Sequence, residues 1–209
     1  MKASQRLDRE DAVKNEQRTS EILTLPNLLS LARVLLTPVF VWAAVRQRPW
    51  LTFGIFLLAG ATDALDGFTA RLFRLKTNLG VWLDPLGDKI LLTAAFVVLT
   101  LPRLSVPNAL PLWLTVICIG RDVLMALGTL VYVSIRGKTV FPPTLAGKIS
   151  TIAAVATLLA VLLANGLGTS PEWLKWLYIL TAGLTGLSGL HYIATGLRRF
   201  FRPPGAPRA

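Results

Sequence analysis

The sequence predicts an all-α, polytopic membrane protein with six transmembrane helices. Of its residues, 53% are hydrophobic, and the mean hydropathy is +0.58. The apolar residues fall in several long runs, and about 20 residues in a helix cross the hydrocarbon layer of a bilayer. Six such runs lie at about 28–46, 51–71, 80–101, 109–135, 147–166 and 173–197.

The two ends of the chain are polar. Residues 1–24 carry five basic and five acidic side chains, without the basic start and small-residue cleavage site of a signal peptide. Residues 200–209 are rich in proline and arginine, which predicts a basic disordered tail. Since the spans use most of the rest, we expect one membrane domain at 25–199, between a polar cytoplasmic N-terminal tail and this C-terminal tail.

The basic residues are distributed unevenly, and this predicts the orientation in the membrane. Of the 22 Lys and Arg, 15 lie in the N-terminal tail, the loops 71–76 and 136–148, and the C-terminus. The three opposite loops carry only four. Cytoplasmic loops of membrane proteins carry this excess. We therefore expect both termini in the cytoplasm, and the net charge of +11 needs no nucleic-acid partner.

Four aspartates lie inside the second and third spans, where ionisable side chains are costly and mark functional sites. Asp63 and Asp66 are three residues apart near the end of one span. Asp84 and Asp88 are four apart at the start of the next. Such offsets place side chains on one helical face, and the short connection 72–79 makes the two helices antiparallel neighbours. We expect the four carboxylates to converge just inside the cytoplasmic surface.

Four converging carboxylates predict a divalent metal site. In a low dielectric they repel one another, so they are either protonated or neutralised by cations. Two divalent ions would balance the charge, and oxygen ligands favour Mg²⁺ or Mn²⁺. Metal pairs about 4 Å apart commonly hold a phosphoryl group during in-line displacement. A carboxylate not fully used as a ligand can take the proton from an attacking hydroxyl.

Small residues share the helical faces of the aspartates. They are Gly67 and Ala70 in the second span and Gly80 in the third. Small side chains allow close helix packing, or they let a bulky ligand approach the backbone. Beside four aspartates we favour the ligand.

The two spans together resemble the motif of CDP-alcohol phosphatidyltransferases, D-x2-D-G-x2-A-R-x8-G-x3-D-x3-D. Every fixed position and the eight-residue gap match, and the resemblance covers about 25–198. The motif positions in this sequence are Asp63, Asp66, Gly67, Ala70, Arg71, Gly80, Asp84 and Asp88.

The resemblance implies a homodimer of six-helix protomers with the site facing the cytoplasm. It implies that Asp63, Asp66 and Asp84 hold a pair of metal ions. It also implies that Asp88 touches a metal and acts as the base toward the acceptor hydroxyl. The residues implied to line the CDP portion of CDP-diacylglycerol are Gly67, Ala70, Arg71 and Gly80. In the implied reaction, the acceptor hydroxyl attacks the lipid-side phosphorus and CMP leaves.

Arg71 has a physical reason to bind the diphosphate, because a guanidinium holds phosphate oxygens in a fork. The alternative is an arginine that snorkels to the membrane surface.

The acceptor alcohol is less well specified. The start of the first span at 25–33 and the run 83–89 resemble bacterial phosphatidylglycerophosphate synthases and the related cardiolipin synthases. We expect glycerol 3-phosphate as acceptor, in a bacterial-type inner (cell) membrane. Phosphatidylglycerol is the alternative acceptor, since the sequence at 120–123 is more similar to that of the cardiolipin synthase branch.

Two basic residues are candidates for binding the acceptor phosphate. Arg121 lies in the fourth span, and Lys148 opens the fifth. Arg121 and Asp122 can equally be structural, satisfying each other or neighbouring backbone. Lys148 can equally be a cytoplasmic anchor. We expect His191 to be structural and Cys118 to be a packing residue.

Two other classes of protein also place charges in a membrane. Aspartates inside spans mark ion routes, so a cation-coupled transporter is an alternative. Six spans without matching broken helices argue against it. A non-catalytic scaffold is the other, although four membrane aspartates without a metal would be costly.

Overall fold

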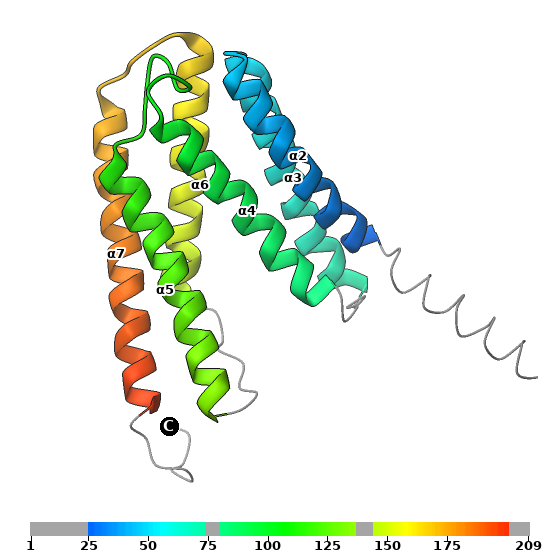
Figure 1. The fold of residues 1–209 in the computed structure, drawn as a ribbon, viewed down its shortest axis with the longest axis vertical. Coiled ribbons are helices and arrows are strands. Elements are labelled where there is room, and N and C mark those ends of the chain that lie inside the picture. The colour runs from blue at the N-terminus through cyan, green and yellow to red at the C-terminus, as the bar shows by residue number, and fades with distance from the viewer. Residues whose placement is uncertain (1–24, 74–79, 137–143, 201–209) are drawn as a thin grey trace, which may run out of the picture. The chain divides into compact units, whose positions relative to one another are not determined.

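The computed structural model describes residues 25–73, 80–136 and 144–200, with side chains over 32–62, 89–131, 134–135 and 144–196. These residues are predominantly helical, which confirms the all-α prediction (Figure 1). The helices are α2 (Leu25–Val45), α3 (Pro49–Phe73), α4 (Gly80–Thr100), α5 (Leu112–Arg136), α6 (Leu145–Leu167) and α7 (Trp173–Phe200). Their bounds lie within about three residues of the predicted runs. Residues 1–24 and 201–209, where polar tails are predicted, lie outside the described residues.

Three of these helices contain segments long and apolar enough to cross a membrane, judged by length and composition. They are Leu112–Val131, Leu145–Leu167 and Trp173–Gly196. Shorter apolar segments occupy the first three helices, at Ala32–Val45, Pro49–Thr62 and Lys89–Thr100. Each of these segments reaches the limit of the described side chains, which do not include the four aspartates.

Large apolar side chains remain exposed on the last three helices. Leu130 of α5 is 63% exposed, Ile152 of α6 is 69% exposed and Leu190 of α7 is 66% exposed. A protein in water rarely leaves extended apolar surfaces uncovered, whereas lipid chains cover them as well as another side chain would. The outward faces of these helices therefore suit a bilayer.

The helix ends have causes in the local sequence. Pro49 opens α3, where its missing N–H removes no helical hydrogen bond. Thr144 caps α6, because its side chain accepts a hydrogen bond from the backbone N–H of Gly147 at 3.1 Å. Gly168 ends α6 with a φ of 66°, a left-handed conformation that glycine adopts without steric cost.

The contacts within the chain define two compact units, residues 1–94 and 95–209. In the first unit, α2 packs along α3 (Figure 1). The rings of Phe40 and Phe56 meet with their centroids 5.9 Å apart. Ala43 of α2 and Ala59 of α3 are completely buried. Small residues at such positions let two membrane helices approach closely.

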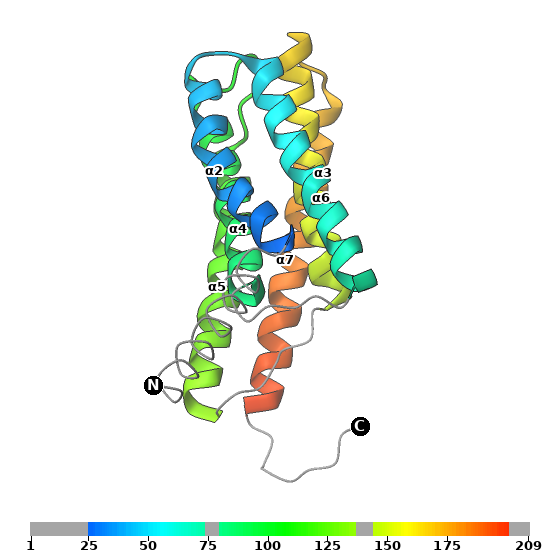
Figure 2. The same ribbon diagram turned by 90° about the vertical axis from the view of Figure 1, so that its right-hand side faces the viewer.

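In the second unit, α7 packs against both α5 and α6, as Figures 1 and 2 show. Polar side chains recur along α7 at offsets of four, three and four residues, which keeps them on one helical face. They are Thr181, Thr185, Ser188 and Tyr192. Their partners, in the same order, are Thr157 of α6 and Cys118, Arg121 and Thr129 of α5. The last helix is thus tied by side-chain hydrogen bonds to both of its neighbours.

Asn165 of α6 holds the segment between α4 and α5. The residue is buried, with 6% of its surface exposed. The Oδ1 atom accepts from the backbone N–H of Asn108 at 2.8 Å and from Asn108 Nδ2 at 3.0 Å. The Nδ2 atom donates to Ser105 Oγ at 2.9 Å and to the Asn108 carbonyl oxygen at 3.0 Å. Both donors and both acceptor sites of the amide are therefore used.

We expect Asn165→Ala to destabilise the protein by about 2 kcal/mol, because it removes four hydrogen bonds and leaves the part-buried backbone N–H of Asn108 without its acceptor. Thermal unfolding in detergent measures this. Glu172→Ala is the control, since the nearby Glu172–Lys175 ion pair has side chains 83% and 71% exposed and should contribute little. Equal melting temperatures for wild type and Asn165→Ala would contradict the role given to the amide.

Candidate functional site

The backbone places the four predicted aspartates on two successive helices. Asp63 and Asp66 belong to α3, and Asp84 and Asp88 belong to α4. Because both stretches are helical, each pair occupies one face of its helix. Only residues 74–79 separate the two helices. The side chains of the four aspartates lie outside the described residues, so their convergence stays a prediction.

The other motif positions share this status. Gly67, Ala70 and Arg71 lie in α3, and Gly80 is the first residue of α4. Their side chains lie outside the described residues, so their place in a nucleotide site stays a prediction. Among the side chains that are described, no three His, Cys, Asp or Glu gather as a metal site would require. The chemistry of the predicted donor set, four hard carboxylate oxygen ligands, fits a divalent cation such as Mg²⁺ or Mn²⁺.

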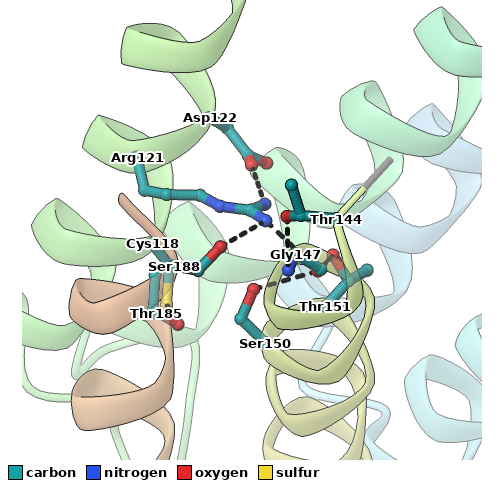
Figure 3. A network of polar contacts seen from close by, with 9 residues as sticks. All are labelled: Cys118, Arg121, Asp122, Thr144, Gly147, Ser150, Thr151, Thr185 and Ser188. Carbon is teal, nitrogen blue, oxygen red and sulfur yellow. Dashed lines mark hydrogen bonds and ion pairs between the residues drawn. The ribbon is translucent and has the colours of Figure 1, made fainter. Parts of the chain in front are cut away.

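The described part of the chain contains a second polar cluster, centred on Arg121 of α5 (Figure 3). Its Nη1 atom lies 2.7 Å from Asp122 Oδ1, forming an ion pair with a hydrogen bond. Its Nη2 atom donates to the carbonyl oxygen of Gly147 in α6 at 3.2 Å and to Ser188 Oγ in α7 at 3.1 Å. One guanidinium thus connects α5, α6 and α7.

The charge of Arg121 is balanced locally. Its side chain is only 9% exposed, and that of Asp122 is 25% exposed. A buried guanidinium without a counter-ion would carry a large desolvation cost, which Asp122 offsets. The buried Nε atom of Arg121 has no hydrogen-bond acceptor among the described residues. The guanidinium therefore keeps donor capacity beyond its three anchors, because it carries five N–H groups.

The start of α6 is shaped to receive this guanidinium. A Cβ atom added to Gly147 would lie 3.1 Å from Arg121 Nη2 and 3.1 Å from Thr144 Oγ1. A larger residue would therefore push the side chain of Arg121 away from the backbone. The carbonyl oxygen of Gly147 also accepts from the hydroxyls of Ser150 and Thr151, both at 3.0 Å. This one carbonyl is a shared acceptor for three side chains.

The sequence predictions for this cluster have mixed outcomes. The contact between Arg121 and Asp122, which the sequence left as one of two alternatives, is present. Lys148 is exposed beside Gly147, and the acceptor-binding role of Arg121 and Lys148 stays a prediction. Cys118 is buried and lies 3.9 Å from Thr185 Oγ1, as a packing residue would. His191 is exposed on α7, and its expected structural role stays untested.

Sequence reasoning missed Ser188 and the Gly147 carbonyl as partners of Arg121. The hydroxyl spacing of Thr181, Thr185 and Ser188 was a usable signal, because it marks one face of a helix. The backbone carbonyl had no signal of its own. Its use depends on how closely α5 approaches the first turn of α6.

Comparison with known proteins supports the membrane-enzyme interpretation. The chain matches the sequence profile of CDP-alcohol phosphatidyltransferases over residues 23–186. It is 32% identical over 160 residues to a cardiolipin synthase (CMP-forming) of Streptomyces coelicolor, covering 72% of this chain and 70% of that protein.

The names of two further relatives refer to phosphatidylglycerophosphate or to glycerol 3-phosphate. The chain is 31% identical over 191 residues to a probable phosphatidylglycerophosphate synthase of Mycobacterium tuberculosis, covering 86% of this chain and 84% of that protein. It is 33% identical over 159 residues to a CDP-diacylglycerol–glycerol-3-phosphate 3-phosphatidyltransferase of Bacillus subtilis, covering 69% and 79%.

These similarities agree with the helical architecture. The three long apolar helices are those of an integral membrane protein, and the aspartates of α3 and α4 fall inside the matched region. Since the profile covers far more than half of the 209 residues, the chain belongs to the CDP-alcohol phosphatidyltransferase family.

Proposed function

We propose that the protein transfers a phosphatidyl group from CDP-diacylglycerol to glycerol 3-phosphate, giving phosphatidylglycerophosphate and CMP in phospholipid biosynthesis. The observation that carries this proposal is the complete family motif between Asp63 and Asp88, on the successive helices α3 and α4. The relatives from M. tuberculosis and B. subtilis, whose names specify this product or this reaction, support the choice of acceptor.

The proposed enzyme spans the membrane six times, as a homodimer whose membrane domain is 25–199. α2, α3 and α4 have 21, 25 and 21 residues, and about 20 are enough to cross the hydrocarbon layer. The uneven distribution of basic residues supports cytoplasmic termini and a cytoplasmic-facing site. A bacterial-type inner (cell) membrane is the proposed location.

Each motif residue has a proposed role. Asp63, Asp66 and Asp84 would hold two divalent ions, Mg²⁺ or Mn²⁺, with Asp88 touching one of them. When bound, the ions would supply positive charge that offsets the charge developing on the diphosphate. The CDP portion of the donor would be lined by Gly67, Ala70, Arg71 and Gly80.

The proposed reaction is an in-line displacement at phosphorus. Asp88 takes the proton from the acceptor hydroxyl. The hydroxyl oxygen forms a bond to the lipid-side phosphorus as the bond from that phosphorus to the bridging oxygen breaks. CMP leaves with that oxygen and its electron pair, while Arg71 is placed to bind the phosphate oxygens in a fork. The lipid product stays in the membrane.

The described polar cluster supports a place for the acceptor phosphate. Lys148 is exposed immediately after Gly147, whose carbonyl oxygen contacts Arg121. Arg121, through its contact with Gly147, and Lys148, the next residue of α6, are therefore two basic residues near the start of α6. A phosphate monoester at this position would gain charge-assisted hydrogen bonds, which are stronger than neutral ones.

Phosphatidylglycerol remains the second candidate acceptor, which would make the protein a cardiolipin synthase. The relative from S. coelicolor carries that name. A cation-coupled transporter is the alternative of a different class, because intramembrane aspartates also serve ion movement.

The proposal is tested by incubating the purified protein with CDP-diacylglycerol and single alcohols. The set includes glycerol 3-phosphate, phosphatidylglycerol, inositol phosphate, serine and choline. We expect CMP release with glycerol 3-phosphate and a lipid product of the mass of phosphatidylglycerophosphate. Turnover with phosphatidylglycerol alone would favour cardiolipin synthesis. Cation binding without CMP release from any mixture would favour a transporter.

We expect Asp88→Asn to lower the rate of CMP release by about 10²-fold or more, because general base catalysis contributes that much. Binding of CDP-diacylglycerol, measured by calorimetry in detergent, should remain largely intact. Glu172→Gln is the control, as an exposed acidic residue. If donor binding collapses together with turnover, Asp88 is mainly a metal ligand and its role as base is wrong.

We expect Lys148→Ala to raise the KM for glycerol 3-phosphate by about tenfold, because charged hydrogen bonds contribute about 1.5–3 kcal/mol. The KM for CDP-diacylglycerol should change little. Lys175→Ala is the matched control, since this exposed lysine lies near the start of α7. An unchanged KM for the acceptor in Lys148→Ala would exclude Lys148 from the acceptor site.

A further inference from the structure

We propose that Ser188 of α7 is a positioning residue that orients Arg121 for the acceptor phosphate. This inference rests on the proposed function, because it assumes that Arg121 binds the phosphate of the acceptor. Ser188 itself would not touch the substrate. Its basis is the hydrogen bond from Arg121 Nη2 to Ser188 Oγ at 3.1 Å. Ser188 is 1% exposed, so its hydroxyl is available to the protein interior and not to a ligand in solution.

The guanidinium is held at three points by three helices. Nη2 carries two hydrogens, and its two acceptors among the described residues are the Gly147 carbonyl oxygen and Ser188 Oγ. Nη1 is held by Asp122 Oδ1 at 2.7 Å. Because the guanidinium is planar, these contacts determine the direction of its remaining N–H groups. Figure 3 shows the hydroxyl of Ser188 reaching the guanidinium from α7, opposite the start of α6.

Two glycines let the backbones of α6 and α7 pass close to the same side chain. A Cβ atom on Gly147 would stand 3.1 Å from Arg121 Nη2, and one on Gly189 would stand 3.8 Å from Arg121 Cγ. The three hydrogen-bonded anchors already order the side chain of Arg121. Binding an acceptor phosphate would then cost little further side-chain ordering, which is the benefit of preorganisation.

Ser188 differs from the other polar side chains on its face of α7. Thr181 contacts the hydroxyl of Thr157, and Thr185 contacts the sulfur of Cys118. Tyr192 contacts Thr129 and a backbone carbonyl. Of Thr181, Thr185 and Ser188, Ser188 is the one whose described hydrogen bond reaches a charged side chain. Its hydroxyl can therefore orient a charge, whereas Thr181 and Thr185 contact neutral groups of α6 and α5.

The test uses full-length enzyme in detergent and measures kcat and the KM for each substrate. We expect Ser188→Ala to raise the KM for the acceptor about fivefold to tenfold, with kcat and the KM for CDP-diacylglycerol changed less than twofold. Thr185→Val is the matched control, because it removes a buried hydroxyl one turn away that contacts only Cys118 among the described residues. Its acceptor KM should match wild type.

Two further variants show whether Ser188 acts through Arg121. The double variant Ser188→Ala/Arg121→Ala should have the acceptor KM of Arg121→Ala alone, because coupled residues are not additive. Gly147→Ala places a methyl group against Nη2 and should raise the acceptor KM in the same way as Ser188→Ala. If Ser188→Ala does not fold, Ser188→Cys replaces the hydroxyl by a weak acceptor and should also raise the acceptor KM, and an unchanged acceptor KM would overturn the inference.

The outcomes separate this inference from the proposed function. If Arg121→Ala raises the acceptor KM but Ser188→Ala only lowers the melting temperature, Ser188 is structural and the inference is overturned, while the proposed function stands. If Ser188→Ala and Arg121→Ala raise the acceptor KM additively, the inference is also overturned. If Arg121→Ala leaves the acceptor KM unchanged, the proposed acceptor site itself is wrong. Absence of CMP release from wild type with every alcohol would overturn the proposed function.

Discussion

The structure depends on one constraint, which is that polar groups between apolar helices must find their partners within the chain. Where water is excluded, an unpaired polar group or charge is costly. The described helices meet this constraint largely by side-chain contacts between elements, and the buried Nε atom of Arg121 is an exception among the described residues. The amide of Asn165 uses all of its hydrogen-bonding capacity on the segment before α5. Arg121 has a carboxylate, a backbone carbonyl and a hydroxyl around it.

α7 is the element on which this arrangement converges. It lies against both α5 and α6, and its polar face provides hydrogen bonds to each. Individual hydrogen bonds between membrane helices contribute only about 0.6 kcal/mol on average. Their value here is also geometric, because a hydroxyl at a given turn sets the register of one helix against the next. The orientation of Arg121 is one consequence of that register.

The same physical cost explains why charged residues identify the family. An aspartate inside a span is retained only where a cation, a proton or a partner offsets its charge. Four aspartates at helical spacing therefore carry more functional information than the apolar residues around them. In the proposed enzyme, metal ions would neutralise the four aspartates, whereas Asp122 already offsets the charge of Arg121. Catalysis would then use charges that the fold cannot leave uncompensated.

The order and approximate bounds of the helices followed from the sequence alone. Long apolar runs have few other structures available to them in a bilayer, so hydropathy located α5, α6 and α7 to within about three residues. The family followed from the spacing between Asp63 and Asp88, because helical periodicity turns sequence distance into a shared face. For Arg121, the sequence left open a structural contact with Asp122 or binding of the acceptor phosphate. The contact could be foreseen because the two residues are neighbours in the sequence.

The sequence by itself determined which residues must be helical and which charges must be compensated, because both depend on local periodicity and on the cost of burial. Tertiary structure decided which partners compensate them. Ser188 is 67 residues from Arg121, and Gly147 is 26 residues away. No local rule links residues so far apart. Their meeting depends on how α5, α6 and α7 pack, which is set by the shapes of many side chains acting together.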